Sequence, residues 1–446
     1  MKNCFLMFSA LIIFISGFGQ DKTAKLDELM NAYAKAFKFN GAVMVVKDGR
    51  ILLDKGYGFR NVKDSVRNDE NSIFQIGSIT KQFTATVILK LQEEKKLSVQ
   101  DKLSKYFPDY PKGDSITIQQ LLTHTSGIYS YTNDQAFMST EVSKPSDRKR
   151  MMALFKDKPL QFSPGTQWEY SNSGYSLLGY IIEDVAKMPY EQAVRKYIFE
   201  PLGMSHSGFD FTHLNSKEKA TGYFRLNDEG NLPAPIVDSS VSFSAGAIYT
   251  TVGDLNKWAQ ALQTNAIISK ASMDKATTPV KNNYGYGLAI DSIAGKRAVG
   301  HSGGIHGFNS NMVRIPEDNT SVILLNNTAS PNLDKITKSI FAILYDLPYE
   351  LPKERTTITM PEAVLQQYTG VYELTPQLVI TITLKDGVLT GKPEGQEALK
   401  LHPEKEDQFF LKEVDAEIKF IRNEKKEVTG MTLLQNGSAV TGKKRL

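Results

Sequence analysis

Residues 41–57, which read GAVMVVKDGRILLDKGY, decide the fold of this chain. They form two β-rich runs, Gly41–Val46 and Ile51–Tyr57, and the turn Lys47-Asp48-Gly49 between them is typical of a β-hairpin. Strand patterns return late in the chain, in four runs: Tyr286–Asp291, Arg297–His301, Asn309–Ile315 and Ser321–Asn326. We therefore expect one antiparallel sheet built from both ends of the sequence.

Helical patterns fill most of the sequence between these strand regions. Residues 78–96 carry the longest early pattern, with apolar side chains recurring on related faces. Further helices are predicted at Asp27–Phe39, Gly174–Met188, Asp254–Gln263 and Ile336–Tyr345. The predicted fold class is α+β: an antiparallel sheet flanked by helices, with an all-helical insertion.

A smaller second domain is predicted near the C-terminal end. Pro348, Pro352 and Pro361 punctuate the region of residues 347–360, which we interpret as a linker. Residues 361–446 are expected to form a small all-β domain, a barrel or a sandwich. The expectation rests on short strand patterns with turn residues between them, at residues 379–384, 388–390, 408–411, 418–421 and 431–434.

The composition is that of an ordinary globular protein. The chain has 446 residues, of which 41% are hydrophobic and 23% charged, and this excludes collagen-like, coiled-coil and mostly disordered classes. The formal net charge of +4 is too small to indicate nucleic-acid binding, and no basic run with interleaved aromatic residues occurs.

The N-terminus reads as a targeting segment. Lys2 is followed by the almost wholly apolar stretch Cys4–Phe18 and the polar residues Gly19–Asp21, which predicts a secretory signal peptide over residues 1–20. An uncleaved anchor is the alternative. Because Cys4 is the sole cysteine, the mature chain would have no thiol. We expect a secreted or periplasmic protein without a membrane span after signal removal.

The first candidate catalytic element is Ser78-Ile79-Thr80-Lys81. A serine at the start of a helix and a lysine three residues later share one face, where a lysine of lowered pKa can take the serine proton. Three other Ser-x-x-Lys sequences begin at Ser146, Ser216 and Ser272. Only Ser78 follows an apolar approach and opens a long helix, so we favour it as the nucleophile.

Two further elements carry polar groups suited to the same chemistry. Tyr170-Ser171-Asn172 offers a phenol as proton shuttle and an amide that can hold the lysine, and Tyr131-Thr132-Asn133 is a competing match. His301-Ser302-Gly303-Gly304 ends a predicted strand, where the Gly304 N–H could join that of Ser78 as an oxyanion hole; His206-Ser207-Gly208 competes with it. His124, His213 and His402 are interpreted as structural, and His306 is left unassigned.

The order of these elements identifies a family resemblance. The chain resembles the class C β-lactamase-like branch of the penicillin-recognising serine hydrolases, which includes D-alanyl-D-alanine carboxypeptidases, D-aminopeptidases and esterases. Leu121–Gly127 and Ser244–Leu255 also look like this family, and the similarity covers roughly residues 25–345. The resemblance selects Tyr170 and His301 over their competitors. It implies a β-lactamase/transpeptidase-like domain over residues 21–346, with a lipocalin-like C-terminal domain.

The resemblance also implies a mechanism without metal or cofactor. Ser78 would attack an amide or ester, Lys81 and Tyr170 would share the proton transfers, and Asn172 would orient Lys81. The oxyanion would bind at the Ser78 and Gly304 N–H groups, with Gly303 beside them.

His301 is a departure from the pattern, because many β-lactamases have a lysine there that grips a substrate carboxylate. Histidine has an ordinary pKa of about 6.5 and is not a fixed cation. The expected substrate is a D-amino-acid peptide, with peptidoglycan fragments among the candidates, or an ester. A β-lactamase is the alternative within the same chemistry, and a catalytically silent cell-wall-binding or sensing module is the alternative from another class.

Overall fold

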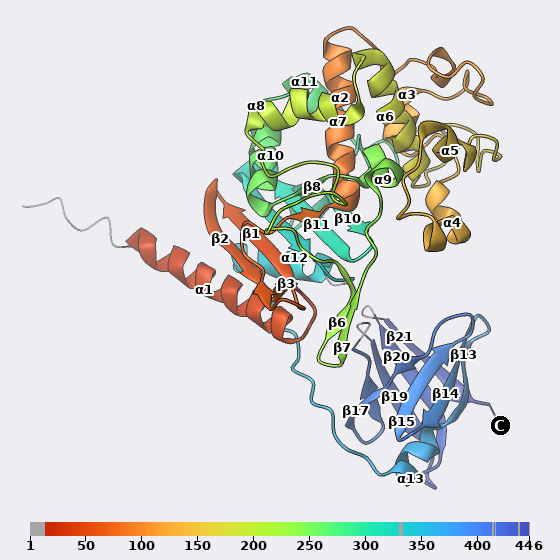
Figure 1. Cartoon of the computed structure of the whole chain (residues 1–446). Coiled ribbons are helices and arrows are strands. Elements are labelled where there is room, and N and C mark those ends of the chain that lie inside the picture. The colour runs from red at the N-terminus through yellow and green to blue at the C-terminus, as the bar shows by residue number, and fades with distance from the viewer. Residues whose placement is uncertain (1–13, 330–332, 413, 415, 436–437, 446) are drawn as a thin grey trace, which may run out of the picture. The chain divides into compact units, whose positions relative to one another are not determined.

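The computed structural model describes residues 14–329, 333–412, 414, 416–435 and 438–445. The chain divides after Leu351 into two compact units (Figure 1). The predicted signal peptide lies partly outside these residues. Within the described part, helix α1 spans Phe14–Lys35, and no helix there is long and apolar enough to cross a membrane.

The first unit is built on a six-stranded antiparallel sheet. Its strand order is β2-β1-β12-β11-β10-β9, so the predicted N-terminal hairpin pairs with the late strands and the predicted α+β fold is confirmed. Val43 of β1 lies opposite Leu324 of β12 in the register. The bounds are β1 (Gly41–Lys47), β2 (Arg50–Tyr57), β9 (Ala289–Ile293), β10 (Lys296–Ile305), β11 (Phe308–Ile315) and β12 (Thr320–Asn326).

Alternating side chains of the central strands face two separate cores. Val43 and Leu324 belong to a core that also contains residues of α1 and of α12 (Leu333–Leu344). Met44 and Ile323, one position along, belong to the larger core beneath the helical region. This period of two is the pattern of a sheet covered on both faces.

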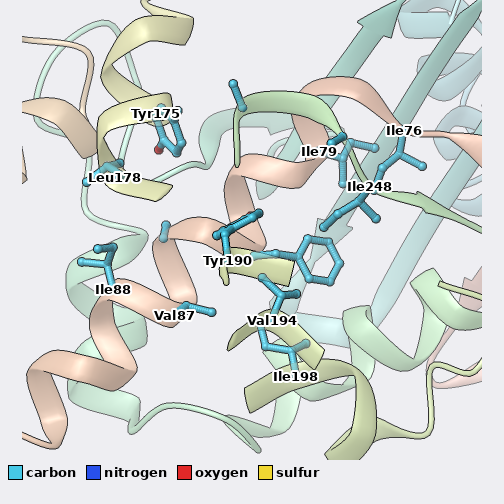
Figure 2. Close-up of a cluster of buried hydrophobic side chains, with 14 of the residues drawn as sticks. Ile76, Ile79, Val87, Ile88, Tyr175, Leu178, Tyr190, Val194, Ile198 and Ile248 are labelled. Carbon is cyan, nitrogen blue, oxygen red and sulfur yellow. The ribbon is translucent and has the colours of Figure 1, made fainter. Parts of the chain in front are cut away.

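The helical region is organised around helix α2 (Thr80–Glu93), which is buried almost all round. Figure 2 shows Val87 and Ile88 of this helix near Leu178 and Tyr190 from later helices. The other helices are η1 (Gly77–Ile79), η2 (Leu103–Lys105), α3 (Ile118–Leu122), η3 (Tyr131–Asn133), α4 (Gln135–Thr140), α5 (Arg148–Ala153), α6 (Asn172–Ala186), α7 (Tyr190–Val194), η4 (Arg195–Phe199), α8 (Glu200–Leu202), α9 (Ser239–Gly246), α10 (Val252–Thr264), α11 (Lys270–Ala276) and η5 (Pro316–Asp318).

Short strand pairs accompany these helices. A hairpin of β6 and β7 falls inside the region predicted as helical. Strand β8 also falls inside that region, and it pairs with β5, which precedes helix α2 in the sequence. The insertion is therefore predominantly rather than wholly helical. Their bounds are β3 (Phe59–Asn61), β4 (Val66–Arg67), β5 (Phe74–Gln75), β6 (Tyr223–Asn227), β7 (Gly230–Pro233) and β8 (Tyr249–Thr250).

Several predicted boundaries were wrong: helix α1 already includes Phe14 instead of beginning at Asp27, and α2 ends at Glu93 instead of residue 96. Three further differences are informative. Helix α1 ends at Lys35 instead of Phe39, because the chain turns through Phe37, whose φ of 55° is left-handed. Strand β9 begins at Ala289 instead of Tyr286, since Gly287 has a φ of 68° and its α-carbon passes close to the Lys81 carbonyl. Strand β10 continues to Ile305, so His301 lies within a strand rather than at its end.

The second unit is the predicted all-β barrel. Its nine antiparallel strands follow the order β16-β15-β14-β13-β21-β20-β19-β18-β17 and curl around a core that includes Tyr368, Phe409 and Phe420. The bounds are α13 (Glu362–Leu365), η6 (Gln366–Tyr368), β13 (Gly370–Thr375), β14 (Leu378–Lys385), β15 (Val388–Pro393), β16 (Leu399–Lys400), β17 (His402–Lys405), β18 (Gln408–Phe410), β19 (Ala416–Arg422), β20 (Val428–Gln435) and β21 (Ser438–Lys444).

Candidate active site

Ser78 and Lys81 meet at the start of the buried helix α2. The Lys81 Nζ atom lies 3.0 Å from Ser78 Oγ, and it donates to Asn172 Oδ1 at 2.8 Å and to the Ala245 carbonyl oxygen at 2.7 Å, which uses both N–H groups of a neutral amine. Three segments far apart in the sequence thus converge on one amine. The structure brings Ser78, Lys81 and Asn172 together as the sequence predicts.

The electrostatic state of Lys81 follows from its burial. Its side chain is 0% exposed, and desolvation holds the pKa of Lys81 well below its ordinary value of 10.5. A neutral amine keeps a lone pair that can accept the Ser78 proton. The contact between Lys81 Nζ and Ser78 Oγ therefore has the geometry of a nucleophile and its general base.

Tyr170 lies close to the Lys81 amine. The Lys81 Nζ atom is 4.8 Å from the centre of the Tyr170 ring. The Tyr170 hydroxyl is buried beside Ser78 and completes no well-formed hydrogen bond with any described group. Burial raises the pKa of Tyr170 well above its usual range, a shift that the Ser78 hydroxyl opposes. The geometry thus favours a neutral phenol, which can give a proton, over a resting phenolate.

The competing sequence Tyr131-Thr132-Asn133 supports the site instead of replacing it. Thr132 Oγ1 accepts a hydrogen bond from Asn172 Nδ2 at 3.1 Å, and Ser130 Oγ accepts one from the Asn172 main-chain N–H at 3.0 Å. Both bonds orient the Asn172 amide so that its oxygen faces Lys81. This supporting role depends on contacts between separate loops and has no local sequence signal.

His301 is buried and paired with a residue that the sequence did not single out. Its Nδ1 atom lies 2.5 Å from the Ser302 carbonyl oxygen, and its Nε2 atom lies 2.7 Å from the Tyr284 hydroxyl. Burial, and then the nearby Lys81, lower the pKa of His301 to about 4. A neutral ring must donate from Nδ1 to the carbonyl, so Nε2 accepts from Tyr284. His301 is therefore not a cation for a substrate carboxylate at neutral pH.

His124 also lies in the site, although the sequence gives it a structural role. It is 1% exposed, and its ring is 4.2 Å from the Tyr170 ring. Its Nδ1 atom accepts the Ser171 main-chain N–H at 3.1 Å, and its carbonyl accepts the Glu169 N–H at 3.0 Å. His124 therefore holds the chain on both sides of Tyr170.

Glycines allow strand β10 to lie directly against the nucleophile turn. A Cβ atom at Gly303 would lie 2.0 Å from the Ile76 carbonyl oxygen. Gly77 has a φ of +51°, and a Cβ there would lie 2.8 Å from the Gly304 nitrogen. The backbone of Gly304 is thus in close contact with the turn that carries Ser78, the arrangement that a two-amide oxyanion hole requires.

A small cavity opens against Ser78. Its volume is about 90 Å³. Among the residues that the structure describes, no group of three or more His, Cys, Asp or Glu side chains is arranged to hold a metal ion. The cavity is lined by Gly77, Ser78, Tyr131, Thr132, Met138, Val142, Asn172, Val237, Val241, Ser242, Ala245, Gly246, Gly304, Ile305 and His306.

Comparison with known proteins identifies the family. Residues 26–346 match the family model described as Beta-lactamase, so the chain belongs to that family. Residues 354–443 match a model described as a domain of unknown function. The resemblance to penicillin-recognising hydrolases is confirmed, and the protein is a serine hydrolase of the β-lactamase and penicillin-binding protein family.

Two of the following three relatives match more than nine tenths of the chain. Penicillin-binding protein 4* of Bacillus subtilis is 29% identical over 430 residues, covering 91% of this chain and 95% of that protein. An octameric penicillin-binding protein homologue from Pyrococcus abyssi is 28% identical, with a TM-score of 0.66 over 94% of this chain and 99% of that one. A D-stereospecific amidohydrolase from Streptomyces is also 28% identical, with a TM-score of 0.63 over 72% of this chain and 98% of that one.

Proposed function

We propose that the protein is an exported hydrolase that forms an acyl-enzyme on Ser78 and hydrolyses an amide or ester, above all a D-amino-acid peptide or ester. The observation that carries this proposal is the buried Lys81 amine, which is 3.0 Å from Ser78 Oγ and has a lowered pKa. The 28% identical amidohydrolase, described as D-stereospecific, supports the substrate class.

Acylation would use each group at a stated atom. Ser78 Oγ attacks the carbonyl carbon and its proton passes to Lys81 Nζ, while the carbonyl electron pair moves onto oxygen. The main-chain N–H groups of Ser78 and Gly304 stabilise that oxyanion. When the bond to the leaving group breaks, Tyr170 supplies the leaving group with a proton and recovers one from Lys81.

Deacylation would repeat these transfers with water. A water molecule attacks the ester carbon and gives its proton to Lys81, and the bond to Ser78 Oγ then breaks as Lys81 returns the proton to that oxygen. Asn172 keeps the amine in place through its 2.8 Å contact. The neutral His301 and its partner Tyr284 form a fixed polar wall beside Tyr170 in this scheme.

Export and domain division are further parts of the proposal. The charged and then apolar N-terminus supports a signal peptide over residues 1–20 and a periplasmic or secreted location. The hydrolase would occupy residues 21–346, the linker residues 347–360 and the barrel residues 361–446. The likeness to a penicillin-binding protein supports a substrate of the cell envelope.

Intact-protein mass after incubation with benzylpenicillin, while the drug itself is followed, tests the substrate assignment. The Ser78→Ala variant is the control. We expect a lasting adduct in the wild type alone, and turnover of D-alanyl peptides or D-amino-acid esters that the variant lacks. Rapid destruction of the drug would make the protein a β-lactamase. Absence of any Ser78-dependent adduct or hydrolysis across these substrates would instead favour a catalytically silent binding module.

A further inference from the structure

The cavity against Ser78 is lined chiefly by aliphatic and small residues. Its apolar side chains come from three separate segments, around residues 138–142, 237–241 and 305, so no single loop defines its shape. Three of them are almost fully buried, with exposed fractions between 1% and 5%. They are Val142, Val237 and Val241, and the partly exposed Met138 and Ile305 complete the set.

Charge is missing from this lining as far as the structure describes it. The described lining residues include no Lys, Arg, Asp or Glu. His306 carries an imidazole there, but burial lowers its pKa below the ordinary value of 6.5. Lys81 is outside the described lining, and its amine is already in contact with three oxygens. A carboxylate that entered the cavity would therefore lose its water without gaining a cation.

The lining also indicates which part of the substrate enters. Gly304 and Ser78, the proposed oxyanion donors, border the cavity. Tyr170, the proposed donor to the leaving group, lies outside the described lining. Since the leaving group must face its proton donor, a cavity that Ser78 and Gly304 border and Tyr170 does not line is assigned to the other side of the scissile bond. That side holds the acyl group.

We propose that this cavity is an acyl subsite that accepts a short, uncharged, apolar acyl group and rejects one that ends in a carboxylate. The inference rests on the proposed acyl-enzyme at Ser78 and specifies its substrate class. A volume of about 90 Å³ is several times the roughly 10–15 Å³ that holds one water molecule, which suits a short acyl chain. The preferred substrates are thus esters or amides whose acyl group presents a short, uncharged, apolar chain to the cavity, as the side chain of a D-alanyl residue would.

Two activated esters that differ at one position test the subsite. p-Nitrophenyl butyrate and p-nitrophenyl hemisuccinate share a leaving group and chain length, but a carboxylate replaces the terminal methyl in the second. We expect kcat/KM for the butyrate to be at least about tenfold higher, because the described lining offers the carboxylate polar groups but no cation to offset its lost hydration. Equal rates, or a preference for the hemisuccinate, would overturn the assignment.

A charge introduced into the cavity provides the second measurement. Met138 is half-buried on helix α4, so Met138→Lys would place an ammonium group at the lining while its stem stays packed. We expect the hemisuccinate-to-butyrate ratio of kcat/KM to rise at least about tenfold. Ala136→Lys is the matched control, since Ala136 is exposed on the same helix and outside the cavity lining.

The ratio of two substrates on one protein is insensitive to partial misfolding. Equal ratios in the Met138→Lys and Ala136→Lys proteins would refute the acyl subsite. Hydrolysis of both esters at equal rates would leave the Ser78 mechanism standing and remove only the subsite. Failure of the wild type to hydrolyse either ester, together with no Ser78 labelling by benzylpenicillin, would remove both proposals.

Discussion

Gly77→Ala is the substitution that most sharply tests the packing of strand β10 against the nucleophile. A Cβ atom at this position would lie 2.8 Å from both the nitrogen and the oxygen of Gly304 and 2.9 Å from its carbonyl carbon. These are main-chain atoms and cannot rotate away, so Gly304 and the Ser78 turn must separate. The φ of +51° adds about 1–2 kcal/mol for any L-residue with a side chain.

The separation should act mainly on catalysis. If the Gly304 N–H moves away from the oxyanion position, the oxyanion loses one hydrogen-bond donor. Removal of one such donor lowers kcat by about 10²–10³-fold. Steady-state hydrolysis of p-nitrophenyl butyrate and thermal unfolding would be measured on the same samples. Because the clash involves Gly304 directly, kcat should fall much further than the modest loss of stability would explain.

Gly203→Ala is the matched control for this experiment. Gly203 also has a left-handed φ, of +62°, but nothing lies within 4 Å of a Cβ placed there. It therefore isolates the conformational cost from the clash and should keep kcat close to that of the wild type. If Gly77→Ala and Gly203→Ala have the same kcat, the proposed role of the Gly77–Gly304 contact is wrong.

Three further predictions concern the buried polar groups. Lys81→Met removes the general base and should lower kcat by about 10²–10⁴-fold; full activity in a folded variant would exclude Lys81 as the base. His124→Leu leaves the buried Ser171 N–H unpaired, so it should lower the free energy of unfolding by about 1–3 kcal/mol and should also lower kcat substantially. Asparagine can accept that bond and tolerates the left-handed φ of 58°, so His124→Asn should keep more of the stability and of kcat than His124→Leu. Equal stability and equal kcat in the two variants would argue against a positioning role for His124. The pKa of His301 falls from 6.5 to about 4 on folding, so the unfolded chain takes up the proton first. Stability is thus fully present above pH 6.5 and is lost, on the order of 3 kcal/mol, as pH falls to about 4. Urea unfolding at pH 6.5 and at about pH 4 measures this loss. The free energy of unfolding should change less between these pH values for His301→Gln than for the wild type, and an equal change in both proteins would contradict the assignment to His301.

The fold was predictable where local patterns carry the information. The hairpin of residues 41–57 has two β-rich runs and an Asp-Gly turn, and the structure pairs it as expected. The boundaries at Phe37 and Gly287 were not predictable, because each depends on a backbone conformation imposed by packing. Ser438–Lys444 was missed because its short, polar strand is defined by its pairing with Val428–Gln435.

The candidate site divides in the same way. Ser78 and Lys81 are neighbours on one helix, so their spacing alone predicts the 3.0 Å contact. Tyr284 reaches His301 from a loop whose sequence has no catalytic pattern, and only the folded chain places it there. His124 was classed as structural because a lone histidine usually is. In the folded chain the buried His124 ring packs on the Tyr170 ring. These residues are 46 positions apart, and sequence spacing does not predict a contact over that separation.

The most direct test of the account is to trap the acyl-enzyme itself. Wild-type protein and the Ser78→Ala variant would be mixed with p-nitrophenyl butyrate and quenched in acid within the first turnover. Peptide mass spectrometry would then locate the acyl group. We predict one butyryl group on the peptide that contains Ser78, and none in the variant. Turnover without any acylated peptide, or a butyryl group whose formation does not require Ser78, would contradict the central claim.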